Sequence, residues 1–264
     1  MKTKALLALS AVLLSTAVFS APAHAEEVSG HVMLGGGMAP EYEGSEDYQA
    51  IPFVAAKVEY GDYYIESRGL GLRANVSPVA GVEFGPAVSY RGGRDDDVDN
   101  NAVAAMREID GTVEVGAFIK VPFRQLMHKT DELSLKAEIM ADVGGVHEGY
   151  TVELGTGYGY SPADKLRLGV DVSTTYASGN YNETYFGIDA NNALRSGLAQ
   201  HDADGGFKDV SLGVTAMYQL NDNWGVMGIA RYTQLIGDAA DSPIVDDEGS
   251  SGQVLVGAGV VYRF

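Results

Sequence analysis

The second half of the chain alternates apolar and polar residues with a period of two. From Val113 to Val121 the odd positions are apolar, whereas Glu114 and Lys120 lie among the even ones. Similar runs begin near residues 133, 150, 166, 207, 224 and 253. Successive side chains of a β-strand point to opposite faces, so each run predicts a strand with one apolar face. Each run has about ten residues, the length that a tilted strand needs to cross a bilayer.

The connections between these runs alternate between short and long. Residues 161–164 and 221–223 read as tight turns, whereas 177–206 and 235–251 are long, polar and rich in glycine. Short turns on one side and long loops on the other are typical of an outer-membrane barrel. A soluble antiparallel sandwich would also alternate apolar and polar residues. The barrel is favoured by isolated charges beside glycines on the polar face and by tyrosines at the ends of apolar runs, namely Tyr90, Tyr150, Tyr160, Tyr176, Tyr218 and Tyr232.

The number of strands is left open by the sequence. Eleven runs are readable, the first five beginning near residues 28, 51, 63, 82 and 112. Bacterial barrels use an even number of strands, with both termini in the periplasm. The expected fold is therefore an all-β, transmembrane, antiparallel up-and-down barrel of 10 or 12 strands, with loops 92–111, 177–206 and 235–251 outside the cell. The ambiguity lies near the N-terminus, where the turn Gly61-Asp62 is unusually tight for the outer side.

The N-terminus explains how such a chain would reach the outer membrane. Two lysines, an apolar stretch from Ala5 to Phe19 and Ala23-His24-Ala25 have the layout of a secretory signal peptide. The alternative, a membrane-spanning helix, needs about 20 apolar residues. We expect residues 1–25 to be cleaved and 26–264 to form the barrel in the Gram-negative outer membrane. Cysteine is absent, so no disulfide supports the fold.

The chain is acidic, with a formal charge of −18 that becomes −20 without the two lysines of the signal segment. Such a charge excludes electrostatic binding of nucleic acid or anionic lipid over the whole surface. Glycine and tyrosine are abundant, at 34 and 15 residues. Both suit strands that line a crowded interior and end at a membrane interface.

Four strings are more specific than the alternation: "EYEGSEDYQAIPF" at 41–53, "RGLGLRANV" at 68–76, "TYFGIDANNALRSGL" at 184–198 and "LIGDAADSPIV" at 235–245. Together they resemble the MipA/OmpV family of outer-membrane proteins, named in part for interaction with the lytic transglycosylase MltA. The resemblance implies a non-enzymatic scaffold joining a murein hydrolase to a murein synthase, or, as in other members, a role in adhesion or in osmotic and drug responses. It makes Tyr42, Gly44, Ser45, Asp238, Asp241 and Pro243 candidate binding residues.

The candidate catalytic and metal-binding residues are few. Residues 94–100 and 238–248 concentrate carboxylates that could hold Ca²⁺ or Mg²⁺ or bridge to lipopolysaccharide, but their spacing matches no known calcium loop. A solvated acidic surface is the alternative, and we expect no metal and no cofactor. His147 and His201 lie in expected loops without a serine elbow, so they read as exposed histidines rather than catalytic bases of a hydrolase.

The polar face of the strands carries charges of both signs. They are Glu83, Arg91, Glu114, Lys120, Lys136, Glu138, Glu153, Arg167 and Asp171. In a narrow interior these charges would pair, whereas an open pore would leave them hydrated. With ten to twelve strands we expect a filled interior. A narrow channel or solute-binding barrel is the alternative function.

The last strand ends in an aromatic residue without a polar tail. Val254, Val256, Val260, Tyr262 and Phe264 share one face of the run that closes the chain. This ending resembles the signal by which the barrel assembly machinery recognises its clients, so we expect Tyr262 and Phe264 to act in assembly. Outer-membrane lipid and lipopolysaccharide are the other expected partners.

Deleting Phe264 tests this interpretation. Losing one aromatic contact normally costs a few kcal/mol, about 3 to 5 in a core. If Phe264 is a recognition element, the truncated protein should accumulate in the periplasm or be degraded in cells, yet refold in detergent with nearly normal strand content. A heat-modifiable band at wild-type abundance in the outer-membrane fraction would show that the residue is not read as a signal.

Overall fold

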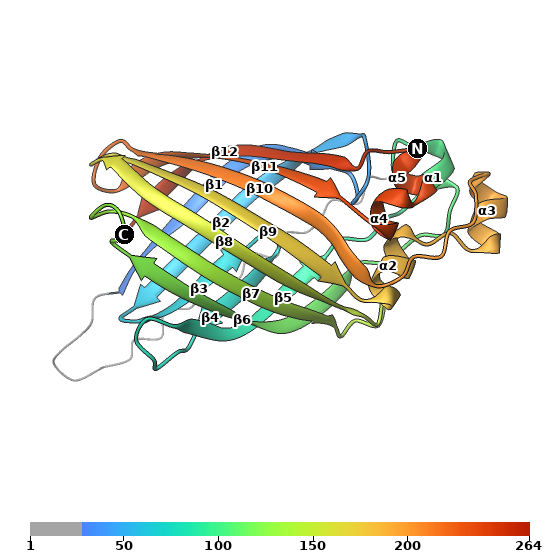
Figure 1. Ribbon diagram of the computed structural model, residues 1–264. Helices are drawn as coiled ribbons and strands as arrows, with labels where there is room; N and C mark the ends of the chain where they lie inside the picture. The colour runs from blue at the N-terminus through green and yellow to red at the C-terminus, as the bar shows by residue number, and fades with distance from the viewer. Residues whose placement is uncertain (1–27) are drawn as a thin grey trace, which may run out of the picture.

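A computed structural model describes residues 28–264, which form a closed barrel of antiparallel strands (Figure 1). The predicted signal peptide and its cleavage site lie outside the described residues. The described strands are β1 (Val28–Pro40), β2 (Tyr48–Tyr60), β3 (Tyr63–Arg68), β4 (Gly71–Asn75), β5 (Glu83–Arg91), β6 (Thr112–Arg124), β7 (Glu132–Asp142), β8 (Tyr150–Ala163), β9 (Leu166–Ala177), β10 (Gly206–Gln219), β11 (Trp224–Leu235) and β12 (Gly252–Arg263).

The first and last strands close the barrel. β1 pairs with β12 from His31 opposite Arg263 to Met38 opposite Val256. Next to the pair His31–Arg263, Gly30 and Phe264 donate backbone hydrogen bonds to each other, at N···O distances of 3.0 and 3.1 Å. A Cβ at Gly30 would lie only 2.9 Å from the Phe264 ring, so the ring lies over this glycine. Phe264 therefore belongs to the closing seam, and its role as an assembly signal stays a prediction.

The described chain has twelve strands, so the larger of the two expected numbers is correct. The strand that the sequence analysis missed is β4, because only one run was read between residues 63 and 82. The string "RGLGLRANV" belongs to a tight hairpin: β3 and β4 have only six and five residues and are joined by Gly69 and Leu70. Gly69 has φ +56°, which favours glycine. The Gly61-Asp62 turn consequently lies at the same end as Val28 and Phe264.

One stretch of the wall is paired on one side only. β2 pairs with β1 along its whole length, but with β3 only from Lys57 to Tyr60. At the next outward-facing position the Ala56 N–H donates to the Ser67 hydroxyl instead of to a strand carbonyl, at 2.8 Å. Pro52 lies on the same edge of β2 and has no N–H to satisfy, as is usual for proline on an edge strand.

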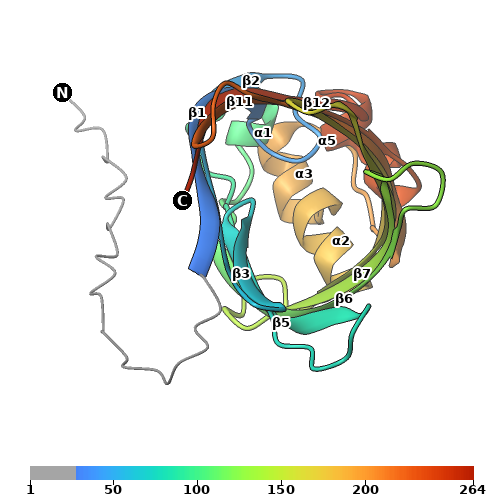
Figure 2. The same cartoon turned by 90° about the vertical axis from the view of Figure 1, so that its left-hand side faces the viewer.

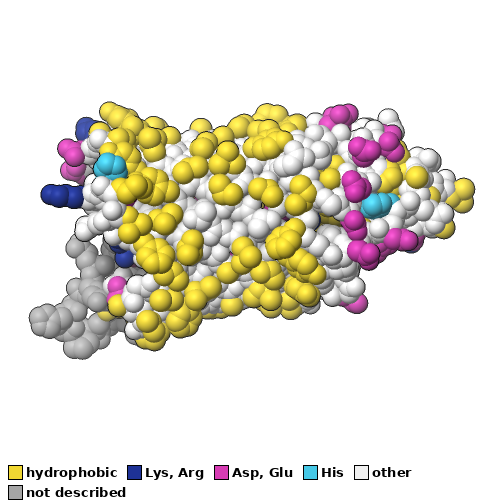
Figure 3. Space-filling model, viewed as in Figure 1, with side chains coloured by type: hydrophobic (Ala, Val, Ile, Leu, Met, Phe, Trp, Pro, Cys, Tyr) yellow, Lys and Arg dark blue, Asp and Glu magenta, His cyan; other side chains and the backbone are white. Residues whose placement is uncertain are grey.

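The alternation of the sequence separates the two faces of the wall. Even-numbered residues of β12, such as Val256 and Val260, are exposed on the outside, as is Phe264. Hydrophobic side chains cover the outer wall in Figure 3, whereas acidic side chains gather at one end. Among the described residues no helix has the length and apolarity to cross a membrane.

The β3–β4 hairpin can be tested with single cysteines, since the chain has none of its own. Leu70 is 72% exposed at the outer end, and Asp62 is exposed at the end that carries Val28 and Phe264. In intact cells a membrane-impermeant maleimide should label Leu70→Cys and spare Asp62→Cys. Permeabilising the outer membrane should make Asp62→Cys reactive. Labelling of Asp62→Cys in intact cells would contradict this strand count.

Candidate functional site

Five loops at the outer end of the barrel fold into a single packed unit. They are residues 41–47, 92–111, 143–149, 178–205 and 236–251, and together they are called the cap. The cap contains the helices α1 (Asn101–Ala104), α2 (Gly179–Phe186), α3 (Ala190–Ser196), α4 (Asp238–Asp241) and α5 (Pro243–Asp246). Viewed along the barrel from the end where the chain reaches its C-terminus, α2 and α3 lie across the mouth (Figure 2).

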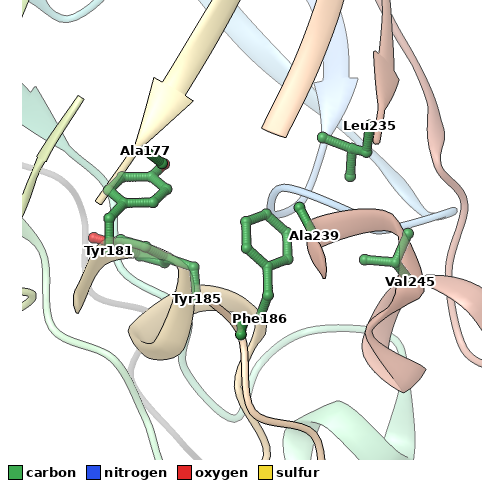
Figure 4. Packing of buried hydrophobic residues seen from close by; sticks show 8 residues of the cluster. Ala177, Tyr181, Tyr185, Phe186, Leu235, Ala239 and Val245 are labelled. Carbon is green, nitrogen blue, oxygen red and sulfur yellow. The ribbon is translucent and has the colours of Figure 1, made fainter. Parts of the chain in front are cut away.

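The cap has its own hydrophobic core. Tyr181 and Phe186 of α2 are fully buried, and Leu235 and Val245 are 1% exposed. Figure 4 shows Phe186 pointing from α2 toward Ala239 of α4. A second cluster joins α1 to α5 through Val103, Met106, Ile188 and Ile244. The outer mouth is therefore closed by packed side chains.

Two of the family strings meet inside the cap. The Gly44 N–H donates to Oε1 of Gln253 at 3.2 Å, and Nε2 of Gln253 donates to the carbonyl of Ser45 at 3.0 Å. Gly44 has φ +100°, and a Cβ there would lie 2.6 Å from Cγ2 of Val245. Gly44 and Ser45 thus hold loop 41–47 against α5 and β12.

The other candidate residues also belong to the cap. Asp238 accepts the backbone N–H of Asp204 on Oδ2 at 2.8 Å, and Pro243 begins α5. Asp241 is exposed. The Tyr42 hydroxyl is buried and has no hydrogen-bond partner among residues 28–264. The structure brings these residues into one unit, and their role in binding a partner stays a prediction.

Directly below the cap lies a group of buried charges that the sequence analysis did not single out. Lys208 is 6% exposed, and its ammonium contacts Glu43 of the cap and Oδ2 of Asp209, the latter at 2.8 Å. Tyr181 donates its hydroxyl to Oε2 of Glu43 at 2.9 Å. These contacts connect loop 41–47 to α2 and to the barrel wall.

A β-bulge explains why Lys208 was missed. The register of β10 against β9 shifts between Phe207 and Asp209, so Lys208 and Asp209 both point inward although they are adjacent. Strict alternation would have placed Lys208 on the lipid face. The sequence did contain a signal for this site: strict alternation places a lysine on the lipid face of a membrane-spanning strand.

Glu43 is ionised at neutral pH. Burial by itself raises the pKa of Glu43, but the nearby charges of Lys208 and Arg91 outweigh burial and hold the pKa below its ordinary value. A carboxyl group with a lowered pKa stabilises the folded state above its unfolded-state pKa. That stabilisation is lost as the pH falls through the folded-state pKa.

His147 is buried, which corrects the expectation of an exposed loop histidine. It is 2% exposed, its Nε2 lies 3.1 Å from Oε1 of Glu114, and its Nδ1 accepts the Gly149 N–H at 3.1 Å. Because Nδ1 accepts a hydrogen bond, the proton lies on Nε2 and is donated to Glu114. Both ring nitrogens of His147 are therefore engaged in hydrogen bonds within the protein.

His201 is half-buried and bonds a backbone carbonyl, that of Asp238, through Nε2 at 2.9 Å. It too differs from the exposed histidine that was expected. Among residues 28–264 no group of three or more histidine or acidic side chains is arranged to hold a metal ion.

The prediction that lumen charges pair is confirmed for eight of the nine residues named from the sequence. The pairs are Lys120 with Glu83, Arg91 with Glu114, Lys136 with Glu153, Arg68 with Glu138 and Glu153, and Arg231 with Asp171. The exception within the described residues is Arg167, which lines a cavity of about 530 Å³ at the periplasmic end. A second cavity of about 260 Å³ lies beside Lys208 and Arg91.

Gly44→Ala should loosen the cap, since the new methyl group would meet Val245 and the backbone has positive φ. Overpacking costs about 1 to 3 kcal/mol. Gly197→Ala is the matched control, because Gly197 has φ +82° with no atom within 4 Å of its would-be Cβ. We expect faster proteolysis of the outer loops in Gly44→Ala than in Gly197→Ala. Equal rates would mean that the contact with Val245 is unimportant.

Comparison with known proteins places this arrangement in a family. The family described as "MltA-interacting protein MipA" matches residues 32–264. The outer membrane protein OmpV of Vibrio cholerae is 41% identical over 90 residues, and the MltA-interacting protein of Escherichia coli K12 is 32% identical over 93. Each of these matches spans only about a third of the relative's length, 33% and 36% respectively. The putative outer membrane protein YiaT of Escherichia coli O157:H7 is 28% identical over 94% of this chain and 97% of its own.

Two solved barrels are similar to this chain at low sequence identity. The NanC porin is 6% identical with a TM-score of 0.47, over 88% of this chain and 98% of that one. An outer membrane channel from Pseudomonas putida F1 is 10% identical with a TM-score of 0.46, over 92% and 99% of the two chains. The family match covers nearly the whole described barrel, and the chain therefore belongs to the family of the MltA-interacting protein MipA.

Proposed function

We propose that this outer-membrane barrel is a non-enzymatic scaffold that binds a murein hydrolase of the MltA type at its periplasmic end, and through it a murein synthase. The observation that carries the proposal is the family match over residues 32–264. A similar protein also supports the proposal, since the relative from Escherichia coli K12 is named MltA-interacting protein. Location in the outer membrane would place this end beside the peptidoglycan.

The periplasmic end offers a suitable docking element in the turn 125–131. Asp131 accepts the backbone N–H groups of Leu126, Met127 and His128 at 2.8, 2.9 and 3.0 Å. Tyr158 also donates its hydroxyl to Asp131, at 3.0 Å. Leu126 and Met127 are 54% and 71% exposed. A fixed turn that exposes two apolar side chains has little conformational entropy to lose on binding.

The remaining expected partners follow from location. The apolar outer wall would contact outer-membrane lipid and lipopolysaccharide, and the barrel assembly machinery would insert the chain. The absence of an enzymatic role is supported by His147, whose two ring nitrogens are already used within the described structure. Relatives are named as outer membrane proteins rather than as enzymes.

A photo-crosslinking amino acid at Met127 tests the scaffold. In intact envelopes it should capture a peptidoglycan-cleaving enzyme, identified by mass spectrometry. The matched control is the same amino acid at Leu194, which is 85% exposed on α3 at the outer end. We expect capture at Met127 and none at Leu194. If crosslinkers at Met127 and at Val79, another exposed periplasmic residue, recover no murein enzyme, the scaffold proposal is wrong.

A further inference from the structure

At the outer end of the lumen, directly below the cap, one carboxylate comes from a loop rather than from the barrel wall. Glu43 reaches down from loop 41–47, while Glu46 of the same loop is exposed to solvent. The two oxygens of Glu43 receive the Lys208 ammonium and the Tyr181 hydroxyl. The arrangement is therefore a carboxylate seated between two donors from different elements, β10 and α2.

The two cations at this position do not need Glu43 for neutralisation. Lys208 also contacts Asp209, and Arg91 holds both oxygens of Glu114, at 2.9 and 3.2 Å. Each cation thus keeps a carboxylate from the wall if Glu43 leaves. The donors of Lys208 and Tyr181 would then face an empty position of carboxylate size. A second carboxylate could fill it without any change in net charge.

The position is also accessible from within the molecule. The Glu43 side chain is surrounded by protein, yet 28% of it remains accessible to water, and the corresponding value for Arg91 is 30%. Both Lys208 and Arg91 line the cavity of about 260 Å³. That cavity also presents Ser89, Thr151 and Thr175, whose hydroxyls can bind the polar groups of a solute. It has room for the body of a small organic acid next to Lys208, one of the two donors.

From these contacts we infer that the lumen below the cap is a binding site for an acidic solute, and that Glu43 is a tethered stand-in for the carboxylate of that solute. The inference is independent of the scaffold role, because it concerns the opposite end of the barrel. A solute that replaces Glu43 releases loop 41–47 from Tyr181 of α2. Occupancy of the site therefore weakens one attachment of the cap.

Chemical rescue of a vacated site tests the inference. Glu43→Ala removes the tethered carboxylate, and Glu46→Ala removes an exposed one from the same loop. Each protein is refolded in detergent and melted with 100 mM acetate or with 100 mM acetamide, which has the same shape but no charge. A ligand that binds only the folded state raises the melting temperature, by about 3 °C or more if acetate binds with a Kd near 10 mM.

We expect acetate, but not acetamide, to raise the melting temperature of Glu43→Ala and to leave that of Glu46→Ala unchanged. Adding Lys208→Met to Glu43→Ala should abolish the rescue. The same melting measurement with phosphate in place of acetate distinguishes a site for any anion from a site specific for carboxylates. The inference is overturned if acetate fails to stabilise Glu43→Ala, if it stabilises Glu46→Ala or the double variant equally, or if phosphate matches acetate.

Should Glu43→Ala not refold, Glu43→Gln provides the second measurement. The amide retains the size of the side chain but loses the charge that Lys208 binds. Acetate should then displace it and accelerate protease cleavage of loop 41–47 relative to acetamide. Equal cleavage in the two solutions would overturn the inference.

Discussion

The structure depends on one constraint, that the backbone in the hydrocarbon region of a bilayer has no water to bond. The main-chain N–H and C=O groups of the wall must find partners within the protein, for the most part in a neighbouring strand, so the sheet has to close on itself. The pairing of β1 with β12, extended by Gly30 and Phe264, achieves this closure.

Closure of the barrel also determines where the charged side chains lie. A twelve-strand barrel is too narrow for charges of opposite sign to stay apart, so the polar faces of the strands meet as ion pairs. The excess of acidic residues lies elsewhere, in the cap loops, which hold 20 Asp and Glu against three Arg. The negative charge of the chain is thus carried almost wholly by the outer end. The cap remains a folded unit because its apolar side chains point inward and most of its carboxylates, Glu43 excepted, point outward (Figure 3).

The sequence predicted the features that follow from period-two alternation and from turn length. Those features are the barrel, the direction of its faces, the long outer loops and the pairing of lumen charges. Prediction from the sequence failed where the alternation of apolar and polar residues is interrupted. The β3–β4 hairpin is too short to show a period, and the bulge at Lys208 reverses the face of one residue. It also failed for His147, because burial of a loop residue depends on contacts between segments far apart in the chain, here with Glu114 and with Tyr181 of α2.

The half-paired stretch of β2 gives the wall a mechanical weak point. Around most of the circumference, pulling two strands apart would break a full ladder of hydrogen bonds. Between β2 and β3 the ladder ends after Lys57, and the stretch from Tyr48 to Ala56 is anchored by β1 and by the hydroxyl of Ser67. The ladder between β4 and β5 is also short, with three pairs. Lateral tension from the surrounding bilayer would therefore separate strands in the region from β2 to β5 before it separated the longer ladders. The seam that would part most easily is thus an internal one, and the joint between the two ends of the chain is stronger.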